Sequence, residues 1–411
     1  ISKGLVGSEM CIRDRSYEGR LFLKLRDWQE KAFPLWWEKR RGIIKVVTGG
    51  GKTFFAIHCL KKYLEKHPNK SILIVVPSIA LLDQWYESLS QYFKDKEISL
   101  NGGGEQTSSI TKICITTIDS LKNIVSLVKA DQSLLIVDEC HKIGTEKRGE
   151  MLTNNWHATL GLSATPERDY DDNFYIIIKK ILGDIIFDYD YIDAREDEVI
   201  VNFKLLYGYA ALLPEEEDKY KKFTKSIQRR AATIGGQDMN DYPLKMLIFN
   251  RARLVKNSKN RIPYGLELIQ KYKRDSWIIF TENKKQAKEF NKAVNKKGFK
   301  SGIYNTDLND EERQENLEAF KSGKLNVLVS CTALDEGFDM PEADGAMILS
   351  SSSSKRQRIQ RMGRVLRITA NKENALIVTV YSSKTEYEKL REESNRYKLE
   401  GVPVRWQQMS L

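Results

Sequence analysis

The sequence predicts an α/β protein with two blocks in tandem, each built around a parallel sheet. Short apolar runs alternate with segments of helical apolar spacing after residue 43, and the same alternation starts again near Ile262. Such alternation is typical of parallel sheets with helices on both faces. The chain of 411 residues also exceeds the length that one ordinary hydrophobic core serves. We therefore expect two similar α/β domains, although no repeat is visible in the residues themselves.

Apolar runs predict the strands of both blocks. In the first block we expect a helix over Ile79–Phe93 and strands at Ile43–Val47, Ser71–Val76, Ile113–Thr116, Ser133–Val137 and Ala158–Leu162. In the second block we expect helices over Lys285–Asn295 and Asn309–Phe320, and strands at Trp277–Phe280, Leu325–Ser330, Ala346–Leu349 and Ala375–Val380. Ligands of such sheets bind beyond the carboxyl ends of the strands, so the residues that follow each strand are the candidates for a site.

Composition narrows the class of protein. Hydrophobic residues make up 41% of the chain and charged residues 30%, with no apolar run long enough to span a membrane. The cysteines are odd in number and scattered without a C-x-x-C pair, which favours a reduced, cytoplasmic setting and argues against a disulfide framework or a zinc site. A net charge of +11 favours an anionic partner such as nucleic acid.

The first residues and the middle of the chain need separate treatment. Residues 1–16 have no clear periodicity and do not begin with Met; Val6–Arg15 resembles translated sequencing-adapter read-through, so we expect a non-native leader there. We expect a first domain over 17–190, a basic connector over 191–261 and a second domain over 262–411. Residues 201–275 hold sixteen Lys and Arg against eight Asp and Glu. This charge fits either a contact with nucleic acid or ordinary solvated helix faces.

A glycine loop lies between the first expected strand and a helical segment. The run Val46-Val47-Thr48-Gly49-Gly50-Gly51-Lys52-Thr53 fits a loop that presents backbone N–H groups and the helix N-terminus to a phosphate chain. In this geometry Lys52 reaches the outer phosphates and the Thr53 hydroxyl lies on a bridging Mg²⁺. The strict G-x-x-x-x-G-K-[ST] pattern requires glycine at Val46, so a glycine-rich turn without a ligand stays possible from these residues alone.

Two adjacent carboxylates follow the strand at Ser133–Val137. Asp138 is placed to hold Mg²⁺ through water, and Glu139 beside it can orient and polarise an attacking water. A solvated acidic strand end is the alternative. Ahead of the glycine loop, the segment Leu25–Gln29 ends in a glutamine whose amide matches the edge of adenine. An amphipathic helix start explains this segment equally well.

These motifs together resemble a known family. Thr48–Thr53, Asp138-Glu139-Cys140-His141 and Leu162-Ser163-Ala164-Thr165-Pro166 resemble motifs I, II and III of superfamily 2 helicases and translocases of the DEAD/DEAH type, which lack the first glycine of the strict pattern. The resemblance implies that Gln29 reads adenine, that Thr48, Gly49, Gly50 and Gly51 cradle ATP, and that His141, Ser163 and Thr165 couple the motifs. It also implies that Pro77, Thr116 and Thr117 contact nucleic acid.

The second block resembles the later motifs of the same family. Ile278–Gln286 resembles motif IV, Ser330–Asp339 motif V and Gln357–Arg367 motif VI. The resemblance implies nucleic-acid contacts by Thr281 and Thr332, ATP contacts by Gly337 and Asp339, and catalytic roles for Gln360, Arg364 and Arg367. Arginines at a spacing of three share one helix face, and a guanidinium can bind two oxygens of a transferred phosphoryl group. The motif style is most similar to XPB-type or restriction-translocase-like DNA helicases, or their phage relatives.

The resemblance implies two RecA-like domains with ATP and Mg²⁺ in a cleft between them. Lys52, Asp138 and Glu139 then act together with Arg364 and Arg367, and hydrolysis drives movement along nucleic acid, with DNA favoured over RNA, by a monomer. An ATP-gated clamp or partner-dependent switch that does not unwind is the alternative. A small-molecule P-loop kinase is a third reading, but it leaves the second block and its arginines without a role.

Overall fold

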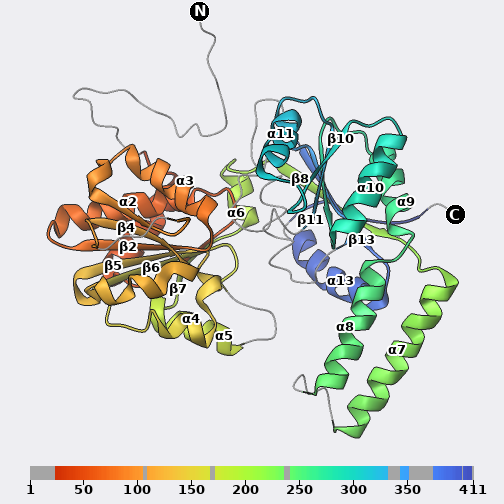
Figure 1. Cartoon of the computed structure of the whole chain (residues 1–411), viewed down its shortest axis with the longest axis horizontal. Helices are drawn as coiled ribbons and strands as arrows, with labels where there is room; N and C mark the ends of the chain where they lie inside the picture. The colour runs from red at the N-terminus through yellow and green to blue at the C-terminus, as the bar shows by residue number, and fades with distance from the viewer. Residues whose placement is uncertain are drawn as a thin grey trace, which may run out of the picture. The chain divides into compact units, whose positions relative to one another are not determined.

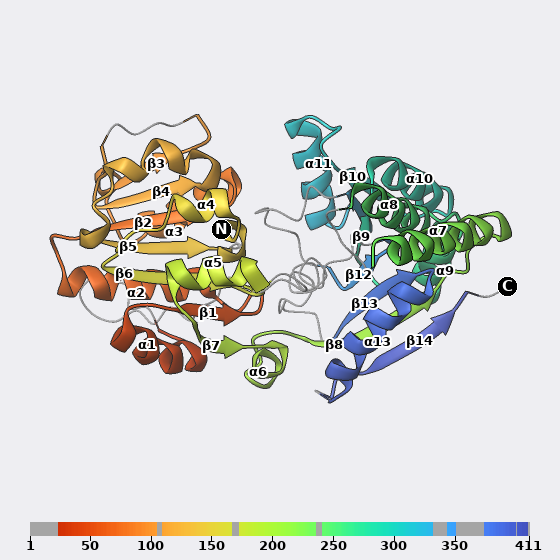
Figure 2. The same ribbon diagram turned by 90° about the horizontal axis from the view of Figure 1, so that it is seen from below.

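The computed structural model describes residues 24–104, 109–166, 172–235, 241–331, 343–350, 374–399 and 401–409. The chain forms two compact units, and the boundary between them falls after Ile200. Each unit contains one seven-stranded parallel sheet covered by helices (Figures 1 and 2). This architecture confirms the predicted fold class of two tandem α/β domains.

The first unit has the following elements. They are α1 (Asp27–Lys39), β1 (Ile43–Val46), α2 (Lys52–Lys66), β2 (Ser71–Val76), α3 (Ile79–Ser90), η1 (Asp95–Glu97), β3 (Ile98–Asn101), β4 (Ile113–Thr117), η2 (Ile118–Asn123), η3 (Val125–Leu127), η4 (Ala130–Gln132), β5 (Ser133–Asp138), η5 (Cys140–Ile143), α4 (Glu146–Glu150), β6 (Ala158–Ser163), α5 (Asp172–Leu182), β7 (Ile185–Tyr189) and α6 (Tyr191–Glu196).

Its sheet has the strand order β3-β4-β2-β5-β6-β1-β7, and every pairing is parallel. The strands β4, β5 and β6 are buried along their whole length, which explains why they read as continuous apolar runs. Figure 1 shows α2 and α3 on one face of the sheet and α4 and α5 on the other. The carboxyl ends of β1, β2, β4, β5 and β6 therefore meet at one edge, where the predicted site residues lie.

The second unit has the following elements. They are β8 (Asn202–Tyr209), α7 (Pro214–Thr233), α8 (Tyr242–Lys256), α9 (Arg261–Lys271), β9 (Trp277–Thr281), α10 (Lys284–Lys296), β10 (Ser301–Tyr304), α11 (Asp310–Lys321), β11 (Val327–Cys331), β12 (Gly345–Ile348), β13 (Asn374–Tyr381), α13 (Lys384–Leu399) and β14 (Val404–Gln408).

Its sheet has the strand order β10-β11-β9-β12-β13-β8-β14, again with parallel pairings. The side chains of α9 and α10 pack on one face, and Gly208 of β8 permits this, because a Cβ there would lie 2.8 Å from the ring of Tyr264. On the other face an aromatic cluster joins three elements: the ring of Trp406 lies 4.6 Å from Tyr207 and 5.1 Å from Tyr387 of α13. Both faces of the central strands are thereby covered.

The range 191–261, for which the sequence predicts a basic connector, has regular structure. It contains α6, β8, α7 and α8, and β8 is hydrogen-bonded between β13 and β14 inside the second sheet. The helices α7 and α8 form a hairpin that extends from the second unit (Figure 1). Arg230 and Asp241 join the two helices near the tip, with 2.6 Å between nitrogen and oxygen. The many charged residues of this hairpin hide its helical periodicity in the sequence.

Candidate nucleotide-binding site

The glycine loop between β1 and α2 has a backbone that only glycine adopts easily. Gly49 and Gly51 have φ angles of 87° and 97°, in the left-handed region. A Cβ on Gly50 would lie 2.5 Å from Cγ1 of Val46, which is closer than atoms can approach. All three glycines are therefore required by the shape of the loop.

The amino end of α1 holds the carbonyl groups of this loop. Trp28 Nε1 and Arg26 Nη1 donate to the carbonyl oxygen of Gly50 at 3.0 and 3.1 Å, and Gln29 Nε2 donates to that of Gly51 at 3.1 Å. Because the N–H of a trans peptide points opposite to its C=O, the N–H groups of Gly51 and Lys52 face away from α1. Backbone N–H groups at the N-terminus of a helix, such as these at the start of α2, suit a phosphate.

Gln29 lies against the loop. It is 1% exposed; its Oε1 accepts the backbone N–H of Arg26 at 2.9 Å, and its Nε2 donates to Gly51. A glutamine amide offers two donor and two acceptor positions, so one of each remains beyond these two bonds. The structure places this side chain at the phosphate loop, and its role in reading adenine stays a prediction.

Asp138 lies at the carboxyl end of β5 and is almost fully buried. Its Oδ2 accepts the indole N–H of Trp85 at 2.9 Å, and its Oδ1 accepts the backbone N–H of Glu139 at 2.9 Å. Burial, followed by the neighbouring Glu139 charge, raises the pKa of Asp138 to about 6, while Lys52 and the two hydrogen bonds oppose the rise. A buried carboxylate next to a second one is an environment that a cation would stabilise.

Lys52 and Glu139 face each other across the loop. Lys52 Nζ donates to the carbonyl oxygen of Val46 at 3.3 Å and lies 4.0 Å from Glu139 Oε1. Glu139 has a φ of 48°, in the left-handed region that a residue with a side chain rarely adopts. This backbone turns the glutamate out of the strand direction and towards the loop.

A series of buried polar contacts connects Glu139 to the end of β6. Glu139 Oε2 lies 3.3 Å from Nδ1 of His141, and this nitrogen lies 3.1 Å from the Ser163 hydroxyl. Ser163 Oγ also accepts the backbone N–H of Thr165 at 3.0 Å. The structure therefore brings Lys52 and Glu139 together with His141, Ser163 and Thr165, the residues predicted to couple the motifs.

The residues at this edge fit a hard cation. No group of three or more His, Cys, Asp or Glu side chains is arranged to hold a metal in the described ranges. Mg²⁺, however, is usually bound by one or two carboxylates together with substrate phosphates and water. Within the same ranges, Thr48 Oγ1 and Thr165 Oγ1 are buried without a hydrogen-bond partner. Thr53 stands in the first turn of α2, next to Lys52.

Three of the threonines predicted to contact nucleic acid, Thr116, Thr117 and Thr281, are buried. Thr116 Oγ1 accepts from Asn101 Nδ2 and donates to the carbonyl of Thr117, while Thr117 Oγ1 caps η2. Thr281 Oγ1 lies 3.1 Å from the carbonyl oxygen of Ser330, to which it donates. These hydroxyls are engaged within the protein, so a direct contact with nucleic acid would require them to exchange partners. Pro77, which lies between the end of β2 and Ser78, the N-cap of α3, is partly exposed.

Six predicted site residues lie outside the described ranges. They are Thr332, Gly337, Asp339, Gln360, Arg364 and Arg367.

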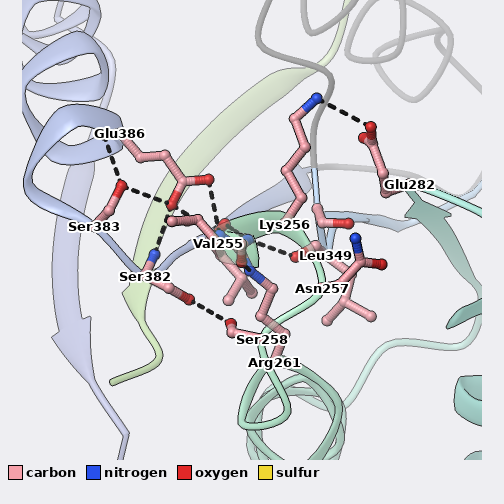
Figure 3. Close-up of polar contacts among 12 residues, drawn as sticks. Val255, Lys256, Asn257, Ser258, Arg261, Glu282, Leu349, Ser382, Ser383 and Glu386 are labelled. Atoms are coloured by element: carbon pink, nitrogen blue, oxygen red, sulfur yellow. Dashed lines mark hydrogen bonds and ion pairs between the residues drawn. The ribbon is translucent and has the colours of Figure 1, made fainter. Parts of the chain in front are cut away.

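The carboxyl ends of the second sheet are joined by a buried polar hub, defined here as Arg261 and its acceptors. The guanidinium of Arg261 donates to the carbonyls of Val255, Leu349 and Val380 and to both oxygens of Glu386, so all five of its N–H groups are used. Figure 3 shows this arrangement, with Ser258 next to Ser382 and Lys256 next to Glu282. The hub fixes the end of α8 to the strand ends β12 and β13.

Sequence reasoning did not find the roles of Arg26, Trp28 and Trp85. Each contacts the site from another part of the chain; Trp85, for example, is 53 residues from Asp138. No local pattern in the sequence distinguishes a tryptophan that donates to a carboxylate from one that fills a core.

A phosphate loop and an Asp-Glu pair at the carboxyl edge of a parallel sheet, followed by a second parallel sheet, define a P-loop nucleotide hydrolase with two RecA-like domains. Family models extend this class. Residues 22–168 match the model "Type III restriction enzyme, res subunit", and residues 260–369 match "Helicase conserved C-terminal domain". The chain belongs to the superfamily 2 helicases, which are ATP-dependent helicases and translocases, and it is an ATPase of that family.

Individual relatives agree with this assignment. The chain is 29% identical to "DNA 3'-5' translocase XPB2" of Sulfurisphaera tokodaii, over 89% of this chain and 83% of that protein. It is 28% identical to "Putative helicase 22" of Sulfolobus islandicus filamentous virus, over 82% of this chain, but it covers only 60% of the viral protein. It likewise covers 56% of the Haloarcula marismortui "Putative DNA 3'-5' helicase Rad25", at 23% identity over 93% of this chain.

Solved structures share the fold. The Hef helicase domain of Pyrococcus furiosus aligns with a TM-score of 0.57 and 17% identity, over 90% of this chain and 98% of that one. Dbp5 of S. cerevisiae bound to RNA and ADP BeF3 aligns with a TM-score of 0.58 and 17% identity, over 94% of this chain and 90% of that one. At this identity the likeness concerns the fold alone.

Proposed function

We propose that this protein couples ATP hydrolysis to movement along DNA, or to its unwinding. The observation that carries the proposal is the continuous series of contacts from Lys52 through Glu139, His141 and Ser163 to Thr165. This series joins Lys52, which is proposed to bind phosphate, to Thr165 in the segment that follows β6. A change at the phosphates can therefore be passed on to another part of the first unit.

The side chains divide the chemistry of ATP hydrolysis among themselves. The N–H groups of the loop and Lys52 bind and orient the phosphates, and Glu139 accepts a proton from the attacking water. Mg²⁺, held by Thr53 and Asp138, would neutralise charge on the phosphate oxygens when it is bound. Arg364 and Arg367, together with Gln360, are proposed to act on the same phosphates from the second domain, with Gly337 and Asp339 contacting the nucleotide.

DNA is proposed as the track on two grounds. A relative that aligns over most of both chains is named as a DNA translocase, and the net charge of this chain is +11. DNA would be bound largely through its phosphate backbone, so the affinity should fall as the salt concentration rises. We propose that residues 24–200 form the ATP-binding domain and residues 201–409 the second helicase domain, in a monomer.

The test is ATP hydrolysis by the purified protein alone and with single-stranded DNA, duplex DNA or RNA. Lys52→Ala is the control that removes the phosphate-binding amine. Stimulation by DNA that exceeds stimulation by RNA, and that is lost in Lys52→Ala, is the expected result. Equal stimulation by RNA would overturn the choice of track, and hydrolysis insensitive to every polymer would overturn the motor.

A second assay separates a motor from the ATP-gated clamp. A strand-displacement assay on partial duplexes and a triplex-displacement assay on blunt duplexes report unwinding and translocation respectively. Displacement of either kind, dependent on ATP and absent in Lys52→Ala, supports movement. DNA-stimulated hydrolysis without displacement in either assay would favour the clamp that opens and closes with ATP.

A further inference from the structure

Trp85 makes a contact that the ATPase motifs do not include. It lies in the second half of α3, is fully buried, and donates its indole N–H to Oδ2 of Asp138 at 2.9 Å. The indole has one donor and no acceptor, so this single bond uses its whole polar capacity. A tryptophan that only filled space here would leave this N–H buried without a partner, which folded proteins avoid.

The two donors to Asp138 differ in what they can control. One is the backbone N–H of Glu139, the residue that directly follows Asp138 in the chain, so it moves together with Asp138. The other is the indole N–H of Trp85, which belongs to the helix α3. The orientation of the carboxylate relative to the rest of the sheet edge is therefore set from α3.

The helix α3 itself starts at a surface. Ser78 caps it by accepting the N–H of Leu81, and Ile79 at its first position is 52% exposed. Pro77, which directly precedes the cap, is one of the predicted contacts with nucleic acid. A displacement of the start of α3 would thus reach Asp138 through a rigid helix and one hydrogen bond.

We propose that Trp85 is a positioning residue of the ATPase: its indole N–H fixes the Asp138 carboxylate and ties it to α3. The inference rests on the proposed function, in which Asp138 holds Mg²⁺ with ATP. Trp85 itself does not contact the reacting atoms. Its effect should appear in turnover and in the Mg²⁺ requirement, while the affinity for metal-free nucleotide is preserved.

The first test compares two tryptophan variants. Trp85→Phe keeps an aromatic ring and removes the N–H. Trp36→Phe is the matched control, because Trp36 is also fully buried and donates its indole N–H at 2.8 Å, but to the carbonyl of Thr159. A hydrogen bond to a charged group corresponds to about a 10- to 100-fold change in an equilibrium or rate. We expect such a fall in kcat and a raised half-saturating Mg²⁺ concentration for Trp85→Phe alone, with unchanged affinity for ADP in EDTA.

The second test does not depend on turnover. The chain has seven tryptophans, and the indole N–H resonance of Trp85 can be assigned by its loss in Trp85→Phe. We expect this resonance to shift on addition of Mg²⁺ and ADP together, and less with ADP in EDTA, while the Trp36 resonance stays in place. Asp138→Asn, a variant that keeps Trp85 in place, should shift the Trp85 resonance without any nucleotide.

The outcomes distinguish this inference from the proposed function. If Trp85→Phe and Trp36→Phe have equal kcat and equal Mg²⁺ dependence while Lys52→Ala is inactive, Trp85 has no positioning role. The proposed ATPase function would still stand. An unmoved Trp85 resonance in Asp138→Asn would overturn the contact itself. A wild-type protein without ATPase activity would instead contradict the proposed function, and the resonance shifts would still decide whether Trp85 responds to Mg²⁺ and ADP.

Discussion

Arg261 and Glu386 form a two-pronged ion pair, in which Nη2 lies 2.8 Å from each carboxylate oxygen. The arginine side chain is fully buried and the glutamate side chain is 27% exposed. The pair joins the start of α9 to the first turn of α13, beneath the ends of β12 and β13. It is therefore a structural pair of the second unit, and it has a testable effect on stability.

Glu386→Gln should destabilise the second unit by about 3 kcal/mol, because it leaves a buried guanidinium without its counter-charge. Denaturant unfolding followed by tryptophan fluorescence measures this loss. The control is Glu388→Gln on the same helix, whose carboxylate lies 3.8 Å from Lys384 in an exposed pair. That change should stay within about 0.5 kcal/mol. Equal losses in the two variants would show that the hub contributes no more than a surface pair.

Glu139→Gln should lower kcat for ATP hydrolysis by about 10²- to 10⁴-fold, because an amide cannot accept the proton of the attacking water. Nucleotide binding should persist, since the loop and Lys52 remain. Steady-state hydrolysis and equilibrium titration with a fluorescent ADP analogue separate the two effects. Glu146→Gln, at an exposed position of α4, is the control and should match the wild type. A normal kcat in Glu139→Gln would remove this residue from the catalytic step.

The pH dependence of stability should carry a contribution from Asp138. Its pKa is raised from 3.8 to about 6 in the folded protein, chiefly by burial. Between these values the folded state binds more protons at this group than the unfolded state, so its contribution to stability falls as pH rises from about 4 to 6. Ionised Asp138 then costs roughly 2–3 kcal/mol at pH 7.

Asp138→Asn removes this titration. In EDTA and without nucleotide, the stability of the variant relative to the wild type should increase by that amount between pH 4.5 and 7.5. Denaturant unfolding of the first unit at several pH values measures the slope. Asp119→Asn is the control, since the Asp119 side chain is 82% exposed. If the difference in the free energy of unfolding between Asp138→Asn and the wild type does not change with pH, the raised pKa of the buried Asp138 carboxyl is contradicted.

The exposed face of α8 should contribute to DNA binding. It combines basic and aromatic side chains: Tyr242 is 70% exposed and Phe249 is 52% exposed, with Lys245 and Arg253 exposed on the same helix. Bases stack on aromatic rings and phosphates pair with cations, so such a face suits a single strand. Lys245→Ala with Arg253→Ala should weaken binding and reduce the slope of log K against log salt by about one to two.

The matched control for this face is Lys292→Ala with Lys297→Ala, which removes two exposed charges near α10. Titration of labelled single-stranded DNA at several salt concentrations measures both double variants. If the two pairs change the slope equally, the effect comes from net charge and the α8 face has no special role.

The sequence predicted the strands that are buried on both faces, because such strands read as unbroken apolar runs. The expected strand at Ser71–Val76 matches β2, and the expected helix at Lys285–Asn295 differs from α10 by one residue at each end. The edge strands β3, β7, β10 and β14 and the internal strand β8 were not predicted. In β14, for example, Val404–Gln408 has no continuous apolar run and is held by its pairing with β8, which lies almost two hundred residues earlier.

The sequence predicted those residues of the site that directly follow a strand. The phosphate loop, Asp138 and Glu139 are adjacent in sequence to the elements that place them. The left-handed backbone of Glu139 and the contacts of Trp28 and Trp85 depend on tertiary packing, so no local pattern reveals them. The burial of Thr116 and Thr281 is likewise a property of neighbouring strands, not of the motifs that contain them.

The position of β8 governs the order in which the second unit can form. This strand is the first of its sheet to be synthesised, yet both of its neighbours, β13 and β14, begin more than 170 residues later. A ribosome would therefore release Asn202–Tyr209 long before any partner strand exists, whereas the first sheet has all its strands once Tyr189 has emerged. Pairings between such distant segments form slowly. The second unit should consequently fold after the first, and its early strand needs protection from aggregation in the meantime.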